Sequence, residues 1–297
     1  MLIESISKTK NTLGEGAWWN DEKQLLHWTD IIAGKLYTFD PKTKEETFQK
    51  FDGTLGCFAP CNNGNFLIGL NLNFYIYNPQ KKTTVKFAEL TEEPKENRIN
   101  DGTTDPLGRF WVGTMTKEGC PKKNNGSLYC IDNKGKVLKF KSGFYTPNGL
   151  AFNKMGDIMY FADTGKDVQT IWQFKYNLKS GIPSNQTIFT KTDDLKGRPD
   201  GGAVDINDYY WSASVEGSCL IRYNPNGKID RTIDLPIKKP TKPVFGGKSL
   251  NIIYITSINN DLSNIDKNRK DLNGSVLAIN QKNYKGFRLS NFNLGKN

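Results

Sequence analysis

Short apolar runs recur along the whole chain, each following a polar or glycine-containing turn and each centred on a large residue. No stretch of about 12 residues keeps an apolar period of 3.6, so the pattern predicts many strands and few helices. The central residues of the six runs are Trp28, Leu67, Trp111, Tyr160, Trp211 and Tyr254. They lie 39, 44, 49, 51 and 43 residues apart, which indicates a structural repeat.

Most copies of the repeat contain a second apolar run that ends in a turn, as in KLYTFDP at residues 35–41 and FYIYNP at residues 74–79. Each unit therefore accommodates three or four short strands in a meander, which is typical of a β-propeller blade. We predict an all-β fold, a single six-bladed β-propeller domain over residues 1–297, closed by an N-terminal strand at residues 2–6. Closure of the ring would remove exposed sheet edges. One or two β-sandwiches are the alternative.

Polar residues occupy one position of the repeat, ten to thirteen residues before the central large residue. The residues at this position are Glu15, Leu55, Asp101, Asn148, Asp200 and Lys242. Each precedes the innermost strand of its predicted blade, and inner strands of a propeller run side by side around a central channel. We therefore expect the oxygen-bearing members, Glu15, Asp101, Asn148 and Asp200, together with Asn100, to converge at one end of the channel, although up to 185 residues separate them.

Carboxylates that converge in this way repel one another unless one takes a proton or a cation lies between them. Carboxylate and amide oxygens are the ligands that hard divalent cations such as Ca²⁺, Mg²⁺ and Mn²⁺ prefer. The pattern therefore favours a cation site in the channel. The alternative is that each Asp-Gly or Asn-Gly pair only forms a turn.

Composition narrows the classes of function. The chain is 36% hydrophobic and 24% charged, as is usual for a globular protein, and no stretch of about 18 apolar residues predicts a membrane span. The net charge is +10, but the lysines are scattered and no nucleic-acid-binding motif occurs, so we expect neither nucleic acid nor membrane as a partner. The first residues, MLIESISKTK, do not resemble a signal peptide, and five cysteines without a C-x-x-C pair predict free thiols. Together these features predict a cytoplasmic protein.

Histidine-based catalysis finds no support in the sequence. The only histidine, His27, lies inside an alternating run and is expected in the core or on the surface. Neither a G-x-S-x-G nor an H-E-x-x-H motif is present. A metal-assisted reaction is compatible with the residues.

Several motifs, spread in order over nearly the whole chain, are shared with one family. They are LGEG at 13–16 with WTDI at 28–31, NRINDG at 97–102 with DPLGR at 105–109 and GTM at 113–115, PNGL at 147–150 with Asp163, PDG at 199–201 and FGG at 245–247. In these motifs the chain resembles the regucalcin, gluconolactonase and luciferin-regenerating enzyme family, whose members are mainly sugar lactone lactonases.

The resemblance implies a six-bladed propeller with one divalent cation in the channel. The family's metal ligands correspond to Glu15, Asn148 and Asp200, and its substrate-contacting residues to Arg98 and Asn100. A further substrate-contacting glutamate corresponds to Glu118, although the segment KEGCP at residues 117–121 departs from the family pattern. The resemblance implies Ca²⁺ as the first expectation, with Zn²⁺, Mn²⁺, Mg²⁺ and Fe²⁺ as the other ions found in the family.

The functional hypothesis is the metal-dependent hydrolysis of a sugar (aldono-) lactone to the aldonic acid by a monomeric enzyme. In this hypothesis Asp200 is the catalytic residue that holds or deprotonates the attacking water. Two other classes remain as alternatives, a non-catalytic regulator that binds a divalent cation and a propeller that serves as an interaction scaffold.

Overall fold

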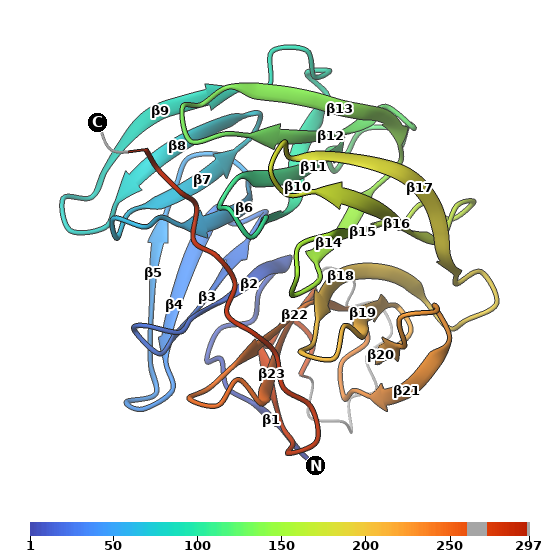
Figure 1. Cartoon of the computed structure of the whole chain (residues 1–297). Helices are drawn as coiled ribbons and strands as arrows, with labels where there is room; N and C mark the ends of the chain where they lie inside the picture. Colours follow the sequence, from blue (N-terminus) through green and yellow to red (C-terminus); the bar gives the residue numbers. More distant parts are fainter. Residues whose placement is uncertain (260–271, 296–297) are drawn as a thin grey trace.

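The computed structural model describes residues 1–259 and 272–295. Within them the chain forms 24 strands arranged as six four-stranded antiparallel sheets around a central axis (Figure 1). This arrangement confirms the predicted all-β six-bladed propeller and rules out the β-sandwich alternative. No helix in the described part of the chain could span a membrane. All five cysteines are free thiols, as expected from their spacing.

The first three blades are meanders of four strands each, numbered from the innermost strand outward. Blade 1 contains β2 (Gly14–Asn20), β3 (Leu25–Asp30), β4 (Lys35–Asp40) and β5 (Glu45–Lys50). Blade 2 contains β6 (Leu55–Pro60), β7 (Phe66–Leu70), β8 (Asn73–Asn78) and β9 (Thr83–Glu89). Blade 3 contains β10 (Asn97–Thr104), β11 (Phe110–Thr116), β12 (Gly126–Ile131) and β13 (Val137–Phe144).

Two further blades follow the same plan, and the last one combines both ends of the chain. Blade 4 contains β14 (Pro147–Phe152), β15 (Ile158–Asp163), β16 (Thr170–Asn177) and β17 (Ile182–Lys191). Blade 5 contains β18 (Arg198–Val204), β19 (Tyr210–Val215), β20 (Cys219–Tyr223) and β21 (Ile229–Asp234). Blade 6 contains β22 (Pro240–Gly246), β23 (Ile252–Ser257), β24 (Leu277–Asn280) and, as its outermost strand, β1 (Leu2–Ser5).

The ring closes through the N-terminal strand, as predicted. Strand β1 pairs with β24 in antiparallel register, from Leu2 opposite Asn280 to Ser5 opposite Leu277. On the inside of the ring, β22 contacts β2, and every other inner strand contacts the next one. The inner strands therefore surround one central channel.

Every inner strand changes its pairing register near its first residues. In blade 1 the shift falls between Glu15 and Trp18, and in blade 3 between Ile99 and Gly102. In blade 4 it falls between Asn148 and Ala151, and in blade 5 between Pro199 and Gly202. Blades 2 and 6 have equivalent shifts. Such β-bulges turn side chains away from the regular alternation of a strand. The shifts coincide with the polar position of the sequence repeat, so polar side chains can face the channel while the rest of each strand supplies the core.

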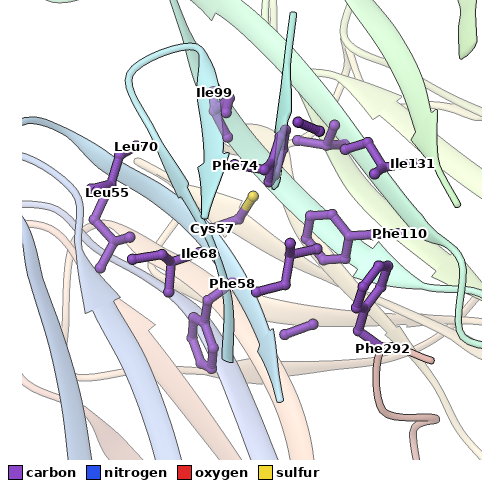
Figure 2. Close-up of a cluster of buried hydrophobic side chains, with 14 of the residues drawn as sticks. Leu55, Cys57, Phe58, Ile68, Leu70, Phe74, Ile99, Phe110, Ile131 and Phe292 are labelled. Carbon is purple, nitrogen blue, oxygen red and sulfur yellow. The ribbon is translucent and has the colours of Figure 1, made fainter. Parts of the chain in front are cut away.

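The large central residues of the repeat pack between neighbouring blades, and each of the six is at most 3% exposed. One cluster lies between blades 2 and 3, where Phe58, Phe74 and Phe110 pack around Cys57 (Figure 2). Phe292 from the C-terminal segment belongs to the same cluster. Burial of such aromatic side chains is the main favourable term that holds adjacent blades together.

The C-terminal segment, residues 281–295, crosses the face of the ring at which the inner strands end, here called the lower face (Figure 1). Backbone hydrogen bonds attach this segment to three inner elements. Gly286 bonds to the turn after β22, Lys285 to the turn after β18, and Phe292 to the end of β6. Beneath it the channel contains a cavity of about 260 Å³ lined by residues that include Leu150, Val244 and Leu289. The segment covers the lower end of the channel, and the polar residues lie at the opposite, upper face.

The closing strand allows a matched pair of substitutions. Ile3 packs against the core of blades 5 and 6, whereas Leu2 is 60% exposed. We expect Ile3→Asp to lower the free energy of unfolding by about 2 kcal/mol, because a partly buried apolar side chain packed against the core is replaced by a charge. Leu2→Asp should change it little. Thermal and chemical unfolding would measure both, and equal losses would contradict the observed register of β1.

His27 should make stability depend on pH. It is 3% exposed, its Nδ1 lies 2.9 Å from Thr38 Oγ1, and burial lowers the pKa of the imidazole to about 4. Because the unfolded state takes up this proton near pH 6.5 and the folded state only near pH 4, stability should fall as the pH drops between these values, by up to about 3 kcal/mol. Unfolding measured at several pH values should show a weaker dependence in His27→Gln than in the wild type. An identical dependence would contradict the assignment.

Candidate functional site

The polar position of the repeat forms a ring at the upper end of the channel. Its polar side chains come from five of the six inner strands and are at most 6% exposed. They are Glu15 (β2), Asp101 (β10), Asn148 (β14), Asp200 (β18) and Lys242 (β22). The structure therefore brings together residues from distant parts of the sequence, as the repeat predicted for the four oxygen-bearing members.

Asp101 forms a buried ion pair with Lys242 across the channel. The Lys242 ammonium donates to both carboxylate oxygens of Asp101, at 2.8 and 3.0 Å. The backbone N–H of Leu150 donates to Asp101 Oδ2 at 3.1 Å. Asp101 thus has its partners within the protein, which leaves the other two carboxyl groups of the ring as the candidates for binding an ion.

Glu15 and Asp200 are buried carboxyl groups that lie close to each other. Burial raises the pKa of Asp200 to about 7, with a further contribution from the negative charge of Asp101. Burial likewise raises the pKa of Glu15 well above its ordinary value, followed by the charges of Asp200 and Asp101. Asp200 Oδ1 has no hydrogen-bond partner among the described residues. Buried carboxylates in this situation require either a proton or a cation.

The charges of the ring fit a divalent cation. Glu15, Asp101 and Asp200 carry three negative charges when ionised, and Lys242 supplies one positive charge, so two negative charges remain uncompensated. No three His, Cys, Asp or Glu side chains within residues 1–259 and 272–295 form a metal-binding group. A cation at this place would therefore use the Asn148 amide oxygen beside the Glu15 and Asp200 carboxylates, a donor set suited to hard ions.

The orientation of Asn148 is fixed by its neighbours. Its Nδ2 donates to Thr164 Oγ1 at 2.7 Å, and that hydroxyl donates to the backbone oxygen of Pro199 at 2.6 Å. Its Oδ1 accepts a hydrogen bond from Asn100 Nδ2 at 2.8 Å and keeps one lone pair. These contacts hold the amide with its oxygen in a defined position, which is what a ligand to an ion requires.

Arg98 links the ring to the loop between β11 and β12. Its Nε and Nη2 donate to the two carboxylate oxygens of Glu118 at 2.8 and 2.5 Å, and its Nη1 donates to Asn100 Oδ1 at 2.8 Å. The structure therefore brings Glu118 to Arg98, although the sequence around Glu118 departs from the family pattern. The side chain of Arg98 is 3% exposed, and one N–H of Nη2 remains without a protein acceptor in the described structure.

Two residues of the site, Lys242 and Arg198, received no role from the sequence. Lys242 occupies the same position of the repeat as the carboxylates, and this position was the available signal for it. Arg198 precedes Asp200 by two residues, just as Arg98 precedes Asn100 by two. Its Nη1 donates to the backbone oxygen of Thr164 at 3.2 Å, so it lies directly beside the network that orients Asn148.

Fold and site together define a six-bladed propeller whose channel contains a buried acidic site next to an arginine–amide network. A model of the family described as SMP-30/Gluconolactonase/LRE-like region matches residues 13–259, and the chain belongs to this family. This confirms the family that the sequence motifs indicated.

Individual relatives match almost the full chain. A 6-deoxy-6-sulfogluconolactonase of Pseudomonas putida is 31% identical over 279 residues, which are 93% of this chain and 94% of the relative. A regucalcin of Xenopus laevis is 29% identical over 288 residues, 96% of each chain. The solved structure of a luciferin-regenerating enzyme superimposes with a TM-score of 0.91 at 28% identity and covers 99% of both chains.

If Glu15, Asn148 and Asp200 bind a cation, its removal should destabilise the protein. At a free concentration 100 times the dissociation constant, a cation bound only to the folded state contributes about 2.7 kcal/mol. We expect Asp200→Asn to abolish most of the stabilisation that Ca²⁺ gives to chelator-treated wild-type protein, measured by thermal unfolding. Glu118→Gln, which lies outside the three ligands, is the control and should retain it. Undiminished stabilisation in Asp200→Asn would contradict the ligand assignment.

Proposed function

We propose that the protein hydrolyses a sugar lactone of the aldonolactone class to the corresponding aldonic acid with the help of one divalent cation. The observation that carries this proposal is the pair of buried carboxyl groups, Glu15 and Asp200, beside the network of Arg98 and Asn100. A cation alone would not need the arginine and its neighbours, so their presence favours an enzyme over a cation-binding regulator.

Glu15, Asn148 and Asp200 would hold the cation. When bound, such an ion supplies Lewis-acid polarisation of the lactone carbonyl and stabilises the negative charge that develops on its oxygen. The ion expected first is Ca²⁺, since carboxylate and amide oxygens are its preferred ligands. Mg²⁺, Mn²⁺, Zn²⁺ and Fe²⁺ are the alternatives to be compared.

Asp200 would act on the attacking water. Its Oδ1 is free of hydrogen bonds among the described residues and can accept a proton from a water molecule that adds to the lactone carbonyl carbon. The bond between this carbon and the ring oxygen then breaks, and the ring oxygen leaves as a hydroxyl group by taking up the proton that Asp200 accepted from the water. A carboxylate is a weak base, so the contribution of Asp200 comes mainly from positioning the water.

Arg98 and Asn100 would orient the substrate. Arg98 offers the remaining N–H of its guanidinium to a hydroxyl or carbonyl oxygen of the lactone and compensates the negative charge of the carboxylate product. The amide group of Asn100 accepts a hydrogen bond from Arg98 and donates one to Asn148, so Asn100 positions both side chains. Glu118 fixes the guanidinium plane of Arg98 through two hydrogen bonds.

The test uses chelator-treated protein, a panel of aldonolactones and each divalent cation in turn, with acid release followed by a pH indicator. We expect cation-dependent turnover that Asp200→Ala lowers by at least about 100-fold, because water positioning and cation binding are both lost.

Asp230→Ala is the control for this experiment. Asp230 pairs with Arg222 at 2.6 Å on the outer part of blade 5, away from the channel. Its replacement should leave turnover unchanged. Near-normal lactonase activity in Asp200→Ala would overturn the assignment, and cation binding without turnover of any lactone would favour the regulator.

A further inference from the structure

Three cationic side chains gather above the buried carboxyl groups at the upper face. Arg98 comes from β10, Lys122 from the loop between β11 and β12, and Arg198 from the first residue of β18. Arg98 and Arg198 are joined by an unbroken series of direct contacts that runs through Asn100, Asn148 and Thr164. The cations therefore border the same site that holds Asp200.

Lys122 is folded toward this site. Its ammonium donates to the backbone oxygen of Thr116 at 2.9 Å, and Thr116 pairs with Asn97, the residue before Arg98. Partial burial lowers the pKa of the Lys122 ammonium, the negative charge of Glu118 opposes this shift, and the positive charges of Arg98 and Arg198 add to it. An ordinary surface lysine extends into water, whereas this one is held near two other cations.

The cations outnumber the carboxylates that pair with them. Arg98 pairs with Glu118 at 2.5 Å and Arg198 with Glu216 at 3.0 Å. Lys122 has no ion pair with a carboxylate in the described part of the chain. Once a divalent cation offsets the two uncompensated negative charges of Glu15 and Asp200, one positive charge is therefore left over at the mouth of the site. Arg198 is 25% exposed and uses three of its five N–H groups on Glu216 and Thr164, which leaves donors for a ligand.

A neutral sugar lactone would not require this surplus charge. Like charges held together cost free energy, and an anionic group on the substrate would compensate the cost and form charge-assisted hydrogen bonds. We propose that the substrate is an anionic sugar lactone, with a sulfonate, phosphate or carboxylate group at the end away from the lactone carbonyl, and that Arg198 and Lys122 bind this group. The inference rests on the proposed lactonase function and specifies its substrate class.

The experiment compares kcat/KM for glucono-1,5-lactone with the values for its 6-phosphorylated and 6-sulfonated counterparts, each corrected for spontaneous hydrolysis. We expect the cation-loaded wild type to prefer at least one anionic lactone by 10-fold or more, and this preference should weaken as ionic strength rises. The anionic lactone with the higher kcat/KM identifies the group that the site binds best. A preference for the neutral lactone would overturn the proposal.

Variants separate a specific role from a general loss of activity. Arg198→Gln should lower the ratio of anionic to neutral kcat/KM by 10-fold or more, mainly through KM, and Arg198→Lys should restore part of it. Lys122→Gln should lower the same ratio by a smaller factor. Lys123→Gln is the matched control, because Lys123 is exposed and pairs with Glu96 at 3.2 Å instead. An unchanged ratio in Arg198→Gln would overturn the proposal.

A binding measurement distinguishes failure of the anion site from failure of the proposed lactonase function. If no lactone is hydrolysed, calorimetry with gluconate and 6-phosphogluconate still measures the preference for the additional anion on the same protein. Tighter binding of 6-phosphogluconate that Arg198→Gln abolishes would support the anion site without lactonase activity. Equal binding of both acids would overturn it.

Discussion

The change of pairing register at the start of each inner strand is the constraint on which the site depends. In a regular strand, side chains alternate between two faces, so a strand that fills the core between blades has few positions left for the channel. The bulge adds a residue and turns Asp101 or Asp200 toward the axis without disturbing the core beyond it. In blade 4 the bulge also requires glycine, because Gly149 has φ +65° and an added Cβ would lie 2.4 Å from the Tyr210 hydroxyl oxygen.

Burial of charge at the axis is costly, and the rest of the molecule compensates for it. Asp101 and Lys242 neutralise each other, whereas Glu15 and Asp200 retain an unfavourable interaction that only a ligand or a proton can relieve. Such an arrangement persists because aromatic packing between six blades over-determines the position of every inner strand. Packing between the blades and the acidic centre are therefore supplied by different parts of the same strands.

The sequence was sufficient to predict the propeller, because each blade must bury a large residue such as Trp111 at the same place and this repeats along the chain. The ring of polar residues followed from the same register. The repeat could not predict which side chains of the ring form ion pairs, because the pairing of Lys242 with Asp101 depends on side-chain conformations across the channel. Glu118 lies in a loop outside the repeat, so only family resemblance pointed to it. For Arg198 the sequence offered only its spacing of two residues before Asp200, which does not predict its contact with Thr164.

Ring closure also determines the order in which the molecule can assemble. Strand β1 pairs with residues 277–280, so residues 2–5, although synthesised before the five consecutive blades, find their partners only after residue 280 has left the ribosome. Blades 1 to 5 each consist of consecutive strands and can form during synthesis. The acidic site, in contrast, needs Glu15 from the first blade beside Asp200 from the fifth. An incomplete chain can therefore contain folded blades before the closed ring holds Glu15 and Asp200 side by side.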